Sequence, residues 1–375
     1  MTIIHVCQFS LLPKNGVQAA VWVLAESQAR QGNEVEILSL GRKPTDDEIT
    51  TCSMLGVSLC GESKKSGILQ LILKASKRTD VSLFHIHSVF IPWQTLLMTL
   101  LSLRKMIYVI SPHGNLGPLE LKRKHFRKAI YLWIILKRNL MKAGAVACVS
   151  KRECEHIQHL IPDVTAFNLG NGVIQAPYIS RMENNEDYRA DSHALRAVFM
   201  GKSDVLHKGF DRMFASAYCF PGGVDFYVIP YNQRELLVEY EDLVRRYKRV
   251  PSIRIHPAVY GDDKLQAYFN ADCYFHLARW EVFGMVFVEA ALAGLPLIIS
   301  KECDMAEELS ATGAALVVDC SRPDFEDSIA AWITSTSFRE AGSKARDWAS
   351  RFYSSEAVAR RSIEYYESVI RRPVN

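Results

Sequence analysis

Short apolar runs alternate with longer amphipathic runs along the chain, a pattern that is typical of an α/β protein. In the first half, the apolar runs predict strands over residues 3–9, 34–40, 81–87, 106–111 and 145–150. The run VSLFHIH, which begins at Val81, is apolar enough for a central strand of a parallel sheet.

The same alternation resumes after a polar break at residues 183–192, which read ENNEDYRADS and predict an exposed linker. Beyond the linker, the pattern predicts strands at 197–200, 225–229, 253–256 and 315–318, and helices at 262–270, 324–333, 338–352 and 356–371. A chain of 375 residues exceeds the size of about 250 to 300 residues at which single cores stop growing. We therefore expect two domains.

Residues 273–300 predict a strand, a polar turn, a helix that begins near Gly284, and a second strand. Glu281 precedes this helix and Glu289 lies about one and a half turns into it, so both lie near the carboxyl end of the preceding strand. A carboxylate accepts two hydroxyl hydrogen bonds, which suits the diol of a ribose or a sugar ring. From the spacing alone, one solvated glutamate and one that favours the helix dipole explain the pair equally well.

A second candidate site lies in the loop after the predicted strand at 197–200. It carries Gly201 and Lys202, then Lys208 and Gly209, just before a helix predicted from about Phe210. The glycines admit a diphosphate to the backbone and the ammonium groups neutralise its charge. An ordinary basic loop has the same composition, so the residues alone leave both readings open.

Three histidines lie at the ends of predicted strands. His85 and His87 are two residues apart and share one face, and His113 follows the strand at 106–111. Metal binding requires a third ligand, and none is near His85 and His87 in the sequence, so hydrogen-bonded histidines are favoured over a metal site. His113 is expected at the mouth of a ligand crevice, where a plain loop histidine is equally compatible with the sequence.

Two glycine patterns carry weaker signals. Gly16 precedes a helix predicted over 17–31 and could let the backbone approach a diphosphate or an acceptor, although a single glycine there is more often a turn. The string GNGVIQ from Gly170 begins like a dinucleotide fingerprint. It lacks the third glycine and the following helix, so a dinucleotide site is not predicted there.

Composition excludes several classes of protein. The nine cysteines are an odd number without C-x-x-C spacing, which indicates reduced core residues of a cytoplasmic protein. The N-terminus lacks a basic leader and reads as a buried strand, so we expect no signal peptide. No apolar run reaches the roughly 20 residues of a membrane span. There is no D-x-D sequence, so we expect no metal cofactor bound by such a motif.

The net charge of +4 is small, but its distribution is uneven. Residues 121–152 contain ten lysines and arginines before the acidic Glu153, and over 122–142 the cations alternate with apolar residues. This pattern predicts a basic amphipathic helix that contacts an anionic membrane surface or a lipid-diphosphate acceptor. A solvated helix face is the alternative. Nucleic-acid binding is not predicted, because no nucleic-acid recognition motif accompanies the charge.

Several of these strings match one known family. EVFGMVFVEAALAGLP from Glu281 resembles the E-x7-E donor motif of the retaining glycosyltransferases of family 4. FMGKSDVLHKGF from Phe199 resembles the Phe-x-Gly-Arg…Lys-Gly segment of that family, with Lys202 at the usual arginine. The segment from Ser111 to Trp133 resembles polysaccharide-type members of the family, and the turn Asn171-Gly172-Val173 resembles the family's Asn-Gly-Val turn. Family members that resemble this chain usually have two adjacent glycines where it has Asn15-Gly16.

The resemblance implies the GT-B fold, in which two Rossmann-like α/β domains face each other across a cleft. The expected boundaries are 1–178 for an acceptor-binding domain, about 179–194 for the linker, 195–352 for the nucleotide-sugar domain, and 353–375 for a helix that returns to the first domain.

The resemblance also implies roles for individual residues. Glu289 is expected to bind the ribose hydroxyls and Glu281 the transferred sugar, while Lys208 and Lys202 bind the diphosphate and His113 contacts the sugar near the reacting carbon. The expected catalytic residues are His113, Glu281 and Lys208. The expected donor-binding residues are Gly16, Lys202, Lys208, Glu281, Phe283, Gly284, Met285 and Glu289.

The function implied is metal-independent, retaining transfer from a nucleotide-diphosphate sugar to a glycan or lipid-linked acceptor in cell-surface polysaccharide biosynthesis. The enzyme is expected in the cytoplasm, peripheral on the inner face of the membrane. A nucleotide-sugar epimerase or a phosphorylase on the same fold, and a catalytically silent sugar-binding scaffold, remain alternatives. The donor sugar, its base, the acceptor and the oligomeric state stay open.

Overall fold

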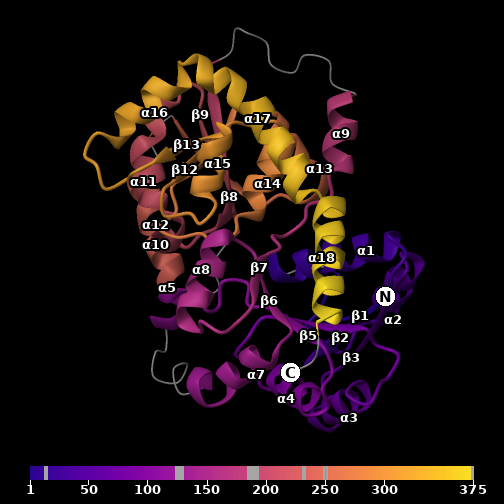
Figure 1. Cartoon of the computed structure of the whole chain (residues 1–375). Coiled ribbons are helices and arrows are strands. Elements are labelled where there is room, and N and C mark those ends of the chain that lie inside the picture. Colours follow the sequence, from indigo (N-terminus) through magenta and orange to yellow (C-terminus); the bar gives the residue numbers. More distant parts are fainter. Residues whose placement is uncertain are drawn as a thin grey trace. The chain divides into compact units, whose positions relative to one another are not determined.

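The computed structural model describes residues 1–11, 16–122, 131–183, 194–229, 234–247, 250 and 252–372 (Figure 1). The chain divides into two compact units. The N-terminal unit comprises Met1–Ile174 together with Ser354–Asn375, and the C-terminal unit comprises Gln175–Tyr353.

The N-terminal unit is built on a seven-stranded sheet with the order β3-β2-β1-β4-β5-β6-β7, in which every pairing is parallel. Its strands are β1 (Thr2–Cys7), β2 (Glu34–Leu40), β3 (Val57–Glu62), β4 (Leu83–His87), β5 (Tyr108–Ser111), β6 (Ala145–Cys148) and β7 (Ala166–Asn168). The strand order reverses between β1 and β4, which makes the carboxyl ends of these strands the topological switch point of the sheet.

Helices connect the strands and cover the sheet. They are α1 (Gly16–Arg30), α2 (Asp46–Met54), α3 (Lys65–Ala75), α4 (Pro92–Leu103), α5 (Pro118–Lys122), the π-helical turn η1 (Leu132–Leu136), α7 (Lys137–Lys142), α8 (Lys151–Leu160) and α18 (Ser355–Ile370). Local signals set several boundaries. Pro92 is the first residue of α4, and the Ser150 side chain caps α8 by accepting a hydrogen bond from the backbone N–H of Glu153.

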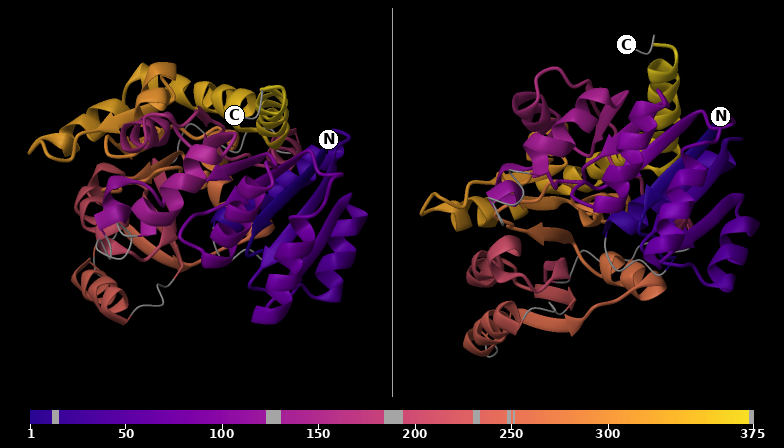
Figure 2. Two further views of the ribbon diagram at one scale, coloured as in Figure 1. Left: turned by 60° about the horizontal axis from the view of Figure 1, so that its bottom comes forward. Right: turned by 90° about the horizontal axis from the view of Figure 1, so that it is seen from below.

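The last helix of the chain belongs to the first unit. Helix α18 packs against α1, and its first turn is joined to the end of the N-terminal segment by a bridge between Val173 and Ser354. Figures 1 and 2 show the yellow α18 beside the indigo α1. The face of the sheet under these helices carries the polar residues described below, whereas the large apolar core cluster includes Ile4, Phe84 and Leu97.

The C-terminal unit repeats the architecture with six parallel strands in the order β10-β9-β8-β11-β12-β13. The strands are β8 (Arg196–Lys202), β9 (Gly223–Ile229), β10 (Ile253–Pro257), β11 (Cys273–His276), β12 (Leu297–Ser300) and β13 (Ala315–Val318). The order reverses between β8 and β11, which gives this unit a switch point of its own.

The helical segments of the C-terminal unit are α9 (Ala176–Glu183), α10 (Val205–Lys208), α11 (Phe210–Ala215), the 3-10 turn η2 (Ser216–Cys219), α12 (Arg234–Tyr247), α13 (Gly261–Phe269), α14 (Met285–Leu292), α15 (Ala306–Thr312), α16 (Phe325–Ile333) and α17 (Thr336–Tyr353). The core is rich in aromatic rings, with Phe199, Phe210, Phe214 and Phe226 fully or almost fully buried against one another.

Two segments differ from the sequence expectation. The linker expected at about 179–194 overlaps helix α9, and its residues 184–193 lie outside the described part of the chain. The helix expected over 122–142 is helical at 131–142, where a π-helical turn precedes α7, while residues 123–130 are not described. A π-turn inserts one extra residue into a helix, so it rotates the side chains that follow.

Candidate functional site

Lys208 and Glu281 form an ion pair at the switch point of the C-terminal sheet. Lys208 ends α10, after β8, and Glu281 lies in the loop after β11; the ammonium Nζ contacts Glu281 Oε2. Their side chains are 15% and 14% exposed, so water screens the contact only in part. Among the described residues, the carboxylate Oε1 has no hydrogen-bond partner, and Lys208 has two further N–H bonds to offer.

Glu289 is paired in the same way, by residues that the sequence analysis did not identify. Its Oε2 accepts a hydrogen bond from Tyr268 at 2.8 Å and contacts the ammonium of Lys264 at 2.5 Å. Lys264 and Tyr268 are four residues apart on α13, so they lie on one helix face. Within the described chain, Glu289 Oε1 is left without a protein partner. Burial, with a contribution from Glu289, raises the pKa of the Tyr268 hydroxyl well above its usual value, which keeps it a donor.

Helix α14 begins between the two glutamates. Gly284 is its N-cap residue, and a Cβ there would lie 2.6 Å from the ring of Phe287. Within the described residues, the backbone N–H groups of Met285 and Val286 have no acceptor, as is usual in the first turn of a helix. Such N–H groups favour an anion. Phe283, the preceding residue, packs on the ring of Tyr353 instead of lying free.

Gly209 brings the lysine loop against the end of β11. It has a φ of 67° and serves as the C-cap of α10, and a Cβ there would lie 2.0 Å from the carbonyl oxygen of Leu277. Only glycine satisfies both conditions. Lys202 lies at the carboxyl end of β8 with an exposed side chain that has no salt bridge among the described residues.

His276, at the end of β11, is a buried residue whose importance was not visible in the sequence. It is 1% exposed, and its Nε2 is one of the buried polar atoms that find no hydrogen-bond partner among the described residues. Burial, with a smaller effect of the Lys208 charge, lowers the pKa of His276 well below its usual value. A neutral ring with one unsatisfied nitrogen therefore lies near the ion pair of Lys208 and Glu281.

In the N-terminal unit, His113 is held in a strained turn after β5. Its φ of 51° and that of Gly114, 82°, place two consecutive residues in the left-handed region. Glu153 holds this turn in place, since its carboxylate accepts hydrogen bonds from the backbone N–H of Gly114 at 2.6 Å and of Val149 at 2.7 Å. Glu153 is 2% exposed, so the two N–H bonds compensate a buried charge.

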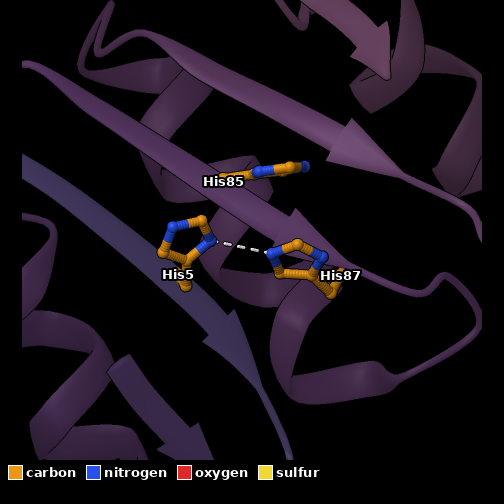
Figure 3. Close-up of side chains that lie close together, drawn as sticks. All are labelled: His5, His85 and His87. Carbon is orange, nitrogen blue, oxygen red and sulfur yellow. Dashed lines mark hydrogen bonds between the residues drawn. The ribbon is translucent and has the colours of Figure 1, made fainter. Parts of the chain in front are cut away.

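His113 is the last of three histidines in a hydrogen-bonded series. His113 Nε2 is 3.0 Å from His87 Nδ1, and His87 Nε2 is 2.9 Å from His5 Nδ1. His5 Nε2 is 2.7 Å from Gln28 Oε1 of α1. Figure 3 shows the contact between His5 and His87 on neighbouring strands, with His85 beside them. No third histidine is near His85 and His87 in the sequence, and it is the pairing of β1 with β4 that brings in His5, which is 82 residues away from His87.

His5, His85 and His87 also meet the distance requirement for a metal site, since one ligand atom of each lies within 4.8 Å of the others. The hydrogen bonds account for the cluster without a cation. His85 contacts the Ser111 hydroxyl at 2.7 Å and the Tyr366 hydroxyl at 2.6 Å, so both of its ring nitrogens are engaged, as are both nitrogens of His5 and His87. A neutral imidazole has one N–H and one lone pair, so a metal would have to replace these bonds.

Two remaining candidates stand apart from these contacts. Gly16 is the first, exposed residue of α1, and Asn15 before it lies outside the described residues. The turn Asn171-Gly172-Val173 contacts the start of α18, and a Cβ at Gly172 would lie 2.9 Å from the Cα of Ser355. This turn therefore serves the packing of the last helix.

Comparison with known families gives two matches. Residues 14–173 match the family described as Glycosyltransferase Family 4, and residues 233–348 match the family described as Glycosyl transferases group 1. No curated protein sequence matches the chain significantly.

Solved structures with the same fold cover nearly the whole chain. Sucrose-phosphate synthase from Thermosynechococcus elongatus superposes with a TM-score of 0.74 at 16% identity, over 98% of this chain and 99% of that one. Anabaena HepE in complex with UDP gives a TM-score of 0.72 at 16% identity, over 98% and 100%. A glycosyltransferase from Rickettsia africae gives 0.72 at 14% identity, over 99% of both chains. At these identities, the likeness shows that the fold is shared.

Proposed function

Since the chain belongs to family 4 of the glycosyltransferases, a retaining family with the GT-B fold, we propose that it transfers a sugar from a nucleotide-diphosphate sugar to a glycan or lipid-linked acceptor. The donor of this family is a nucleotide sugar. The observation that carries the proposal is how the carboxylate oxygens of Glu281 and Glu289 are paired. Each glutamate has one carboxylate oxygen engaged by a lysine, and its other oxygen has no hydrogen-bond partner among the described residues, at the switch point where a parallel sheet binds its ligand.

The roles of the donor site follow from that arrangement. Glu289 Oε1 accepts the hydrogen bonds of the ribose diol, with Lys264 and Tyr268 fixing the carboxylate. Glu281 Oε1 accepts hydroxyls of the transferred sugar, while Lys208 keeps its bond to Glu281 and directs its remaining N–H groups to the diphosphate.

Lys202 and the N-terminus of α14 supply further positive potential for the leaving nucleotide. Lys202 replaces the arginine usual in the family, so it contributes a point charge without a bidentate fork. The N–H groups of Met285 and Val286 complete an anion site of the kind that helix N-termini form. These groups stabilise negative charge as it develops on the phosphate, which makes the reaction independent of a metal.

The proton of the acceptor hydroxyl goes to the leaving phosphate in this proposal, on the same face of the sugar, so that configuration is retained. His113 contacts the sugar near the reacting carbon. Anabaena HepE has been determined with UDP-glucose, which makes uridine nucleotides the first donors to test.

Donor binding is tested by thermal unfolding with UDP, GDP and ADP and with their glucose or mannose conjugates, each with and without EDTA. A ligand at 100 times its dissociation constant adds about 2.7 kcal/mol to the free energy of unfolding. We expect one nucleotide family to stabilise the chain equally in EDTA. Stabilisation that appears only with a divalent ion would contradict the assignment of Lys202 and Lys208.

Turnover is tested with Glu289→Gln and Lys208→Ala, which should each reduce the transfer rate about 100-fold or more, the loss expected for one oriented polar contact. Glu307→Gln, on the first turn of α15, is a control for removal of a carboxylate elsewhere. Near-normal transfer in both site variants would refute the roles. Donor binding without turnover on any acceptor would favour a sugar-binding scaffold instead.

We also propose that the enzyme acts at the inner face of the membrane, supported by the helical segment 131–142. Ile134 is 70% exposed and Met141 is 48% exposed, beside the exposed cations Arg138 and Lys142. Exposed apolar side chains flanked by cations are the composition of an interfacial helix. Within the described chain, none of the helices is both long and apolar enough to span a bilayer.

A cavity of about 490 Å³ lies next to this segment, at the amino ends of β5, β6 and β7. It is lined by Lys105, Lys142 and Arg372 and by the apolar side chains of Met106, Met141 and Val369. Three cations over an apolar floor suit the phosphate and upper acyl chain of an anionic lipid.

Vesicle sedimentation tests the membrane proposal. We expect the protein to bind vesicles of phosphatidylcholine with phosphatidylglycerol but not vesicles of phosphatidylcholine alone, and the binding to weaken as salt is added. The double variant Arg138→Glu with Lys142→Glu should lose it. Lys151→Glu changes an exposed cation at the carboxyl end of β6, opposite the amino end that Lys142 precedes, and should bind normally. Equal binding by all three proteins would contradict the proposal.

A further inference from the structure

The hydrogen-bonded histidines connect His113 to the last helix of the chain. The series runs from His113 through His87 and His5 to Gln28 on α1, with the distances given above. Gln28 Nε2 then lies 2.8 Å from the Ser362 hydroxyl on α18, and that hydroxyl lies 2.6 Å from the backbone carbonyl of Ala359. Each link is a hydrogen bond, so the position of every proton depends on the next link.

Each of the three rings carries a single ring proton near neutral pH. Burial lowers the pKa of His5 to about 4 and that of His113 to about 4, and it lowers the pKa of His87 well below its usual value. A neutral imidazole has one nitrogen that donates and one that accepts. The direction of one hydrogen bond in the series therefore fixes the directions of all the others.

The backbone carbonyl of Ala359 sets that direction. A carbonyl oxygen only accepts, so the Ser362 hydroxyl donates to it, and the serine oxygen accepts from the Gln28 amide. The amide nitrogen of Gln28 is thereby turned to Ser362 and its carbonyl Oε1 to His5. Since Oε1 also only accepts, His5 must carry its proton on Nε2.

The remaining protons follow in order. His5 Nδ1 has the lone pair and accepts from His87 Nε2–H, and His87 Nδ1 accepts from His113 Nε2–H. His113 is then left with its lone pair on Nδ1, for which the described residues offer no hydrogen-bond donor. The opposite proton order would require Gln28 to turn over and Ser362 to give up its bond to Ala359. The loss of about one hydrogen bond makes the order described here favoured by about tenfold.

We propose that Ser362 and Gln28 are positioning residues that select the tautomer of His113, so that Nδ1 is a hydrogen-bond acceptor for a substrate hydroxyl. The last helix of the chain thus controls the chemistry of a loop some 250 residues earlier in the sequence. A second series runs from Tyr366 through His85 to Ser111 and on to the carbonyl of Ala147, and the Tyr366 hydroxyl also lies close to the side chains of Gln28 and Ser362. The identification of the substrate hydroxyl that His113 Nδ1 accepts from rests on the proposed function. The selection of the His113 tautomer does not depend on it.

The tautomer is measured directly by long-range proton–nitrogen NMR correlation on the full-length protein labelled with 15N-histidine, without any ligand. A ring nitrogen without a proton resonates far downfield of one that carries it. His113 is identified among the 11 histidines by the signal that His113→Asn removes. We expect the Nδ1 signal of His113 at the position of an unprotonated nitrogen and the Nε2 signal at that of a protonated one. The reverse assignment would overturn the proposal.

Three variants test the control by α1 and α18. Gln28→Met removes the acceptor of the His5 proton, and Ser362→Ala allows the Gln28 amide to turn over, so both should move the His113 signals toward an average of the two tautomers. Gln28→Glu keeps an acceptor for His5 and should resemble the wild-type protein. His113 signals that stay unchanged in Gln28→Met and in Ser362→Ala would overturn the proposal. If Gln28→Met does not fold, the His113 signals of Ser362→Ala and of the wild-type protein still test whether α18 selects the tautomer.

Kinetics separate positioning from a general loss of structure. The substrate is the nucleotide sugar that stabilises the chain most in the thermal panel. Gln28→Met should lower kcat/KM about tenfold in the wild-type background and have no further effect when His113 is already alanine. Equal losses in both backgrounds would overturn the role of Gln28. A chain that binds no nucleotide sugar would instead refute the proposed function and leave the NMR result standing.

Discussion

Acid should destabilise the N-terminal unit through its buried histidines, before the carboxylates begin to titrate. His5 is fully buried in the sheet, and burial lowers its pKa from 6.5 to about 4. In the unfolded chain the same ring is solvated and takes up a proton as the pH falls below about 6.5. The contribution of the buried, neutral His5 ring to the free energy of unfolding is therefore complete above that pH. It is lost progressively as the pH falls toward 4.

The size of the effect follows from the pKa of His5. Because the unfolded ring is almost fully protonated at pH 5 and the folded ring is almost fully neutral, His5 alone should cost about 2 kcal/mol between pH 7 and pH 5. Burial also lowers the pKa values of His85 and His87 well below their usual value, so both residues add to this loss in the wild-type protein. Unpaired carboxylates titrate mainly near pH 4, below this range.

Urea unfolding at pH 7, 6 and 5 measures the effect by comparing the wild-type protein with His5→Gln. Glutamine can keep hydrogen bonds to its neighbours but does not titrate, so the variant should lose about 2 kcal/mol less than the wild-type protein over this range. His159→Gln, which changes an exposed histidine of α8, serves as the control and should follow the wild-type curve. Parallel curves for His5→Gln and the wild-type protein would refute the reasoning.

Three further outcomes follow from the contacts around the two candidate sites. Glu153→Gln leaves only one amide oxygen for the N–H groups of Gly114 and Val149, so we expect a loss of about 1 to 3 kcal/mol in urea unfolding; an unchanged midpoint would contradict this role. Gly209→Ala forces a Cβ against the Leu277 carbonyl in a left-handed turn, and thermal unfolding should show a loss of about 2 kcal/mol or more. Removing divalent ions with EDTA should leave the transfer rate unchanged, and a rate restored only by added metal would contradict the role given to the lysines.

The sequence was enough to predict much of the fold, because its signals are local. Apolar runs marked β1, β2 and most of the other strands, and glycine marked a helix boundary at Gly284, the N-cap of α14. Parallel strands with helical connections place their carboxyl ends at one edge. The candidates His113, Lys208 and Glu281 were therefore found from their positions after strands, and the GT-B fold from motifs around the same residues.

Only the tertiary structure decided which side chains meet. The ion pair of Lys208 with Glu281 spans 73 residues, and the contact of His5 with His87 spans 82. Both depend on the order of the strands, which places β8 beside β11 and β1 beside β4. No periodicity of 2 or 3.6 residues carries that information, because it reports which face of an element is buried and not which element covers it. For the same reason, Gln28 and Ser362 could be recognised only after α18 had returned to pack on α1.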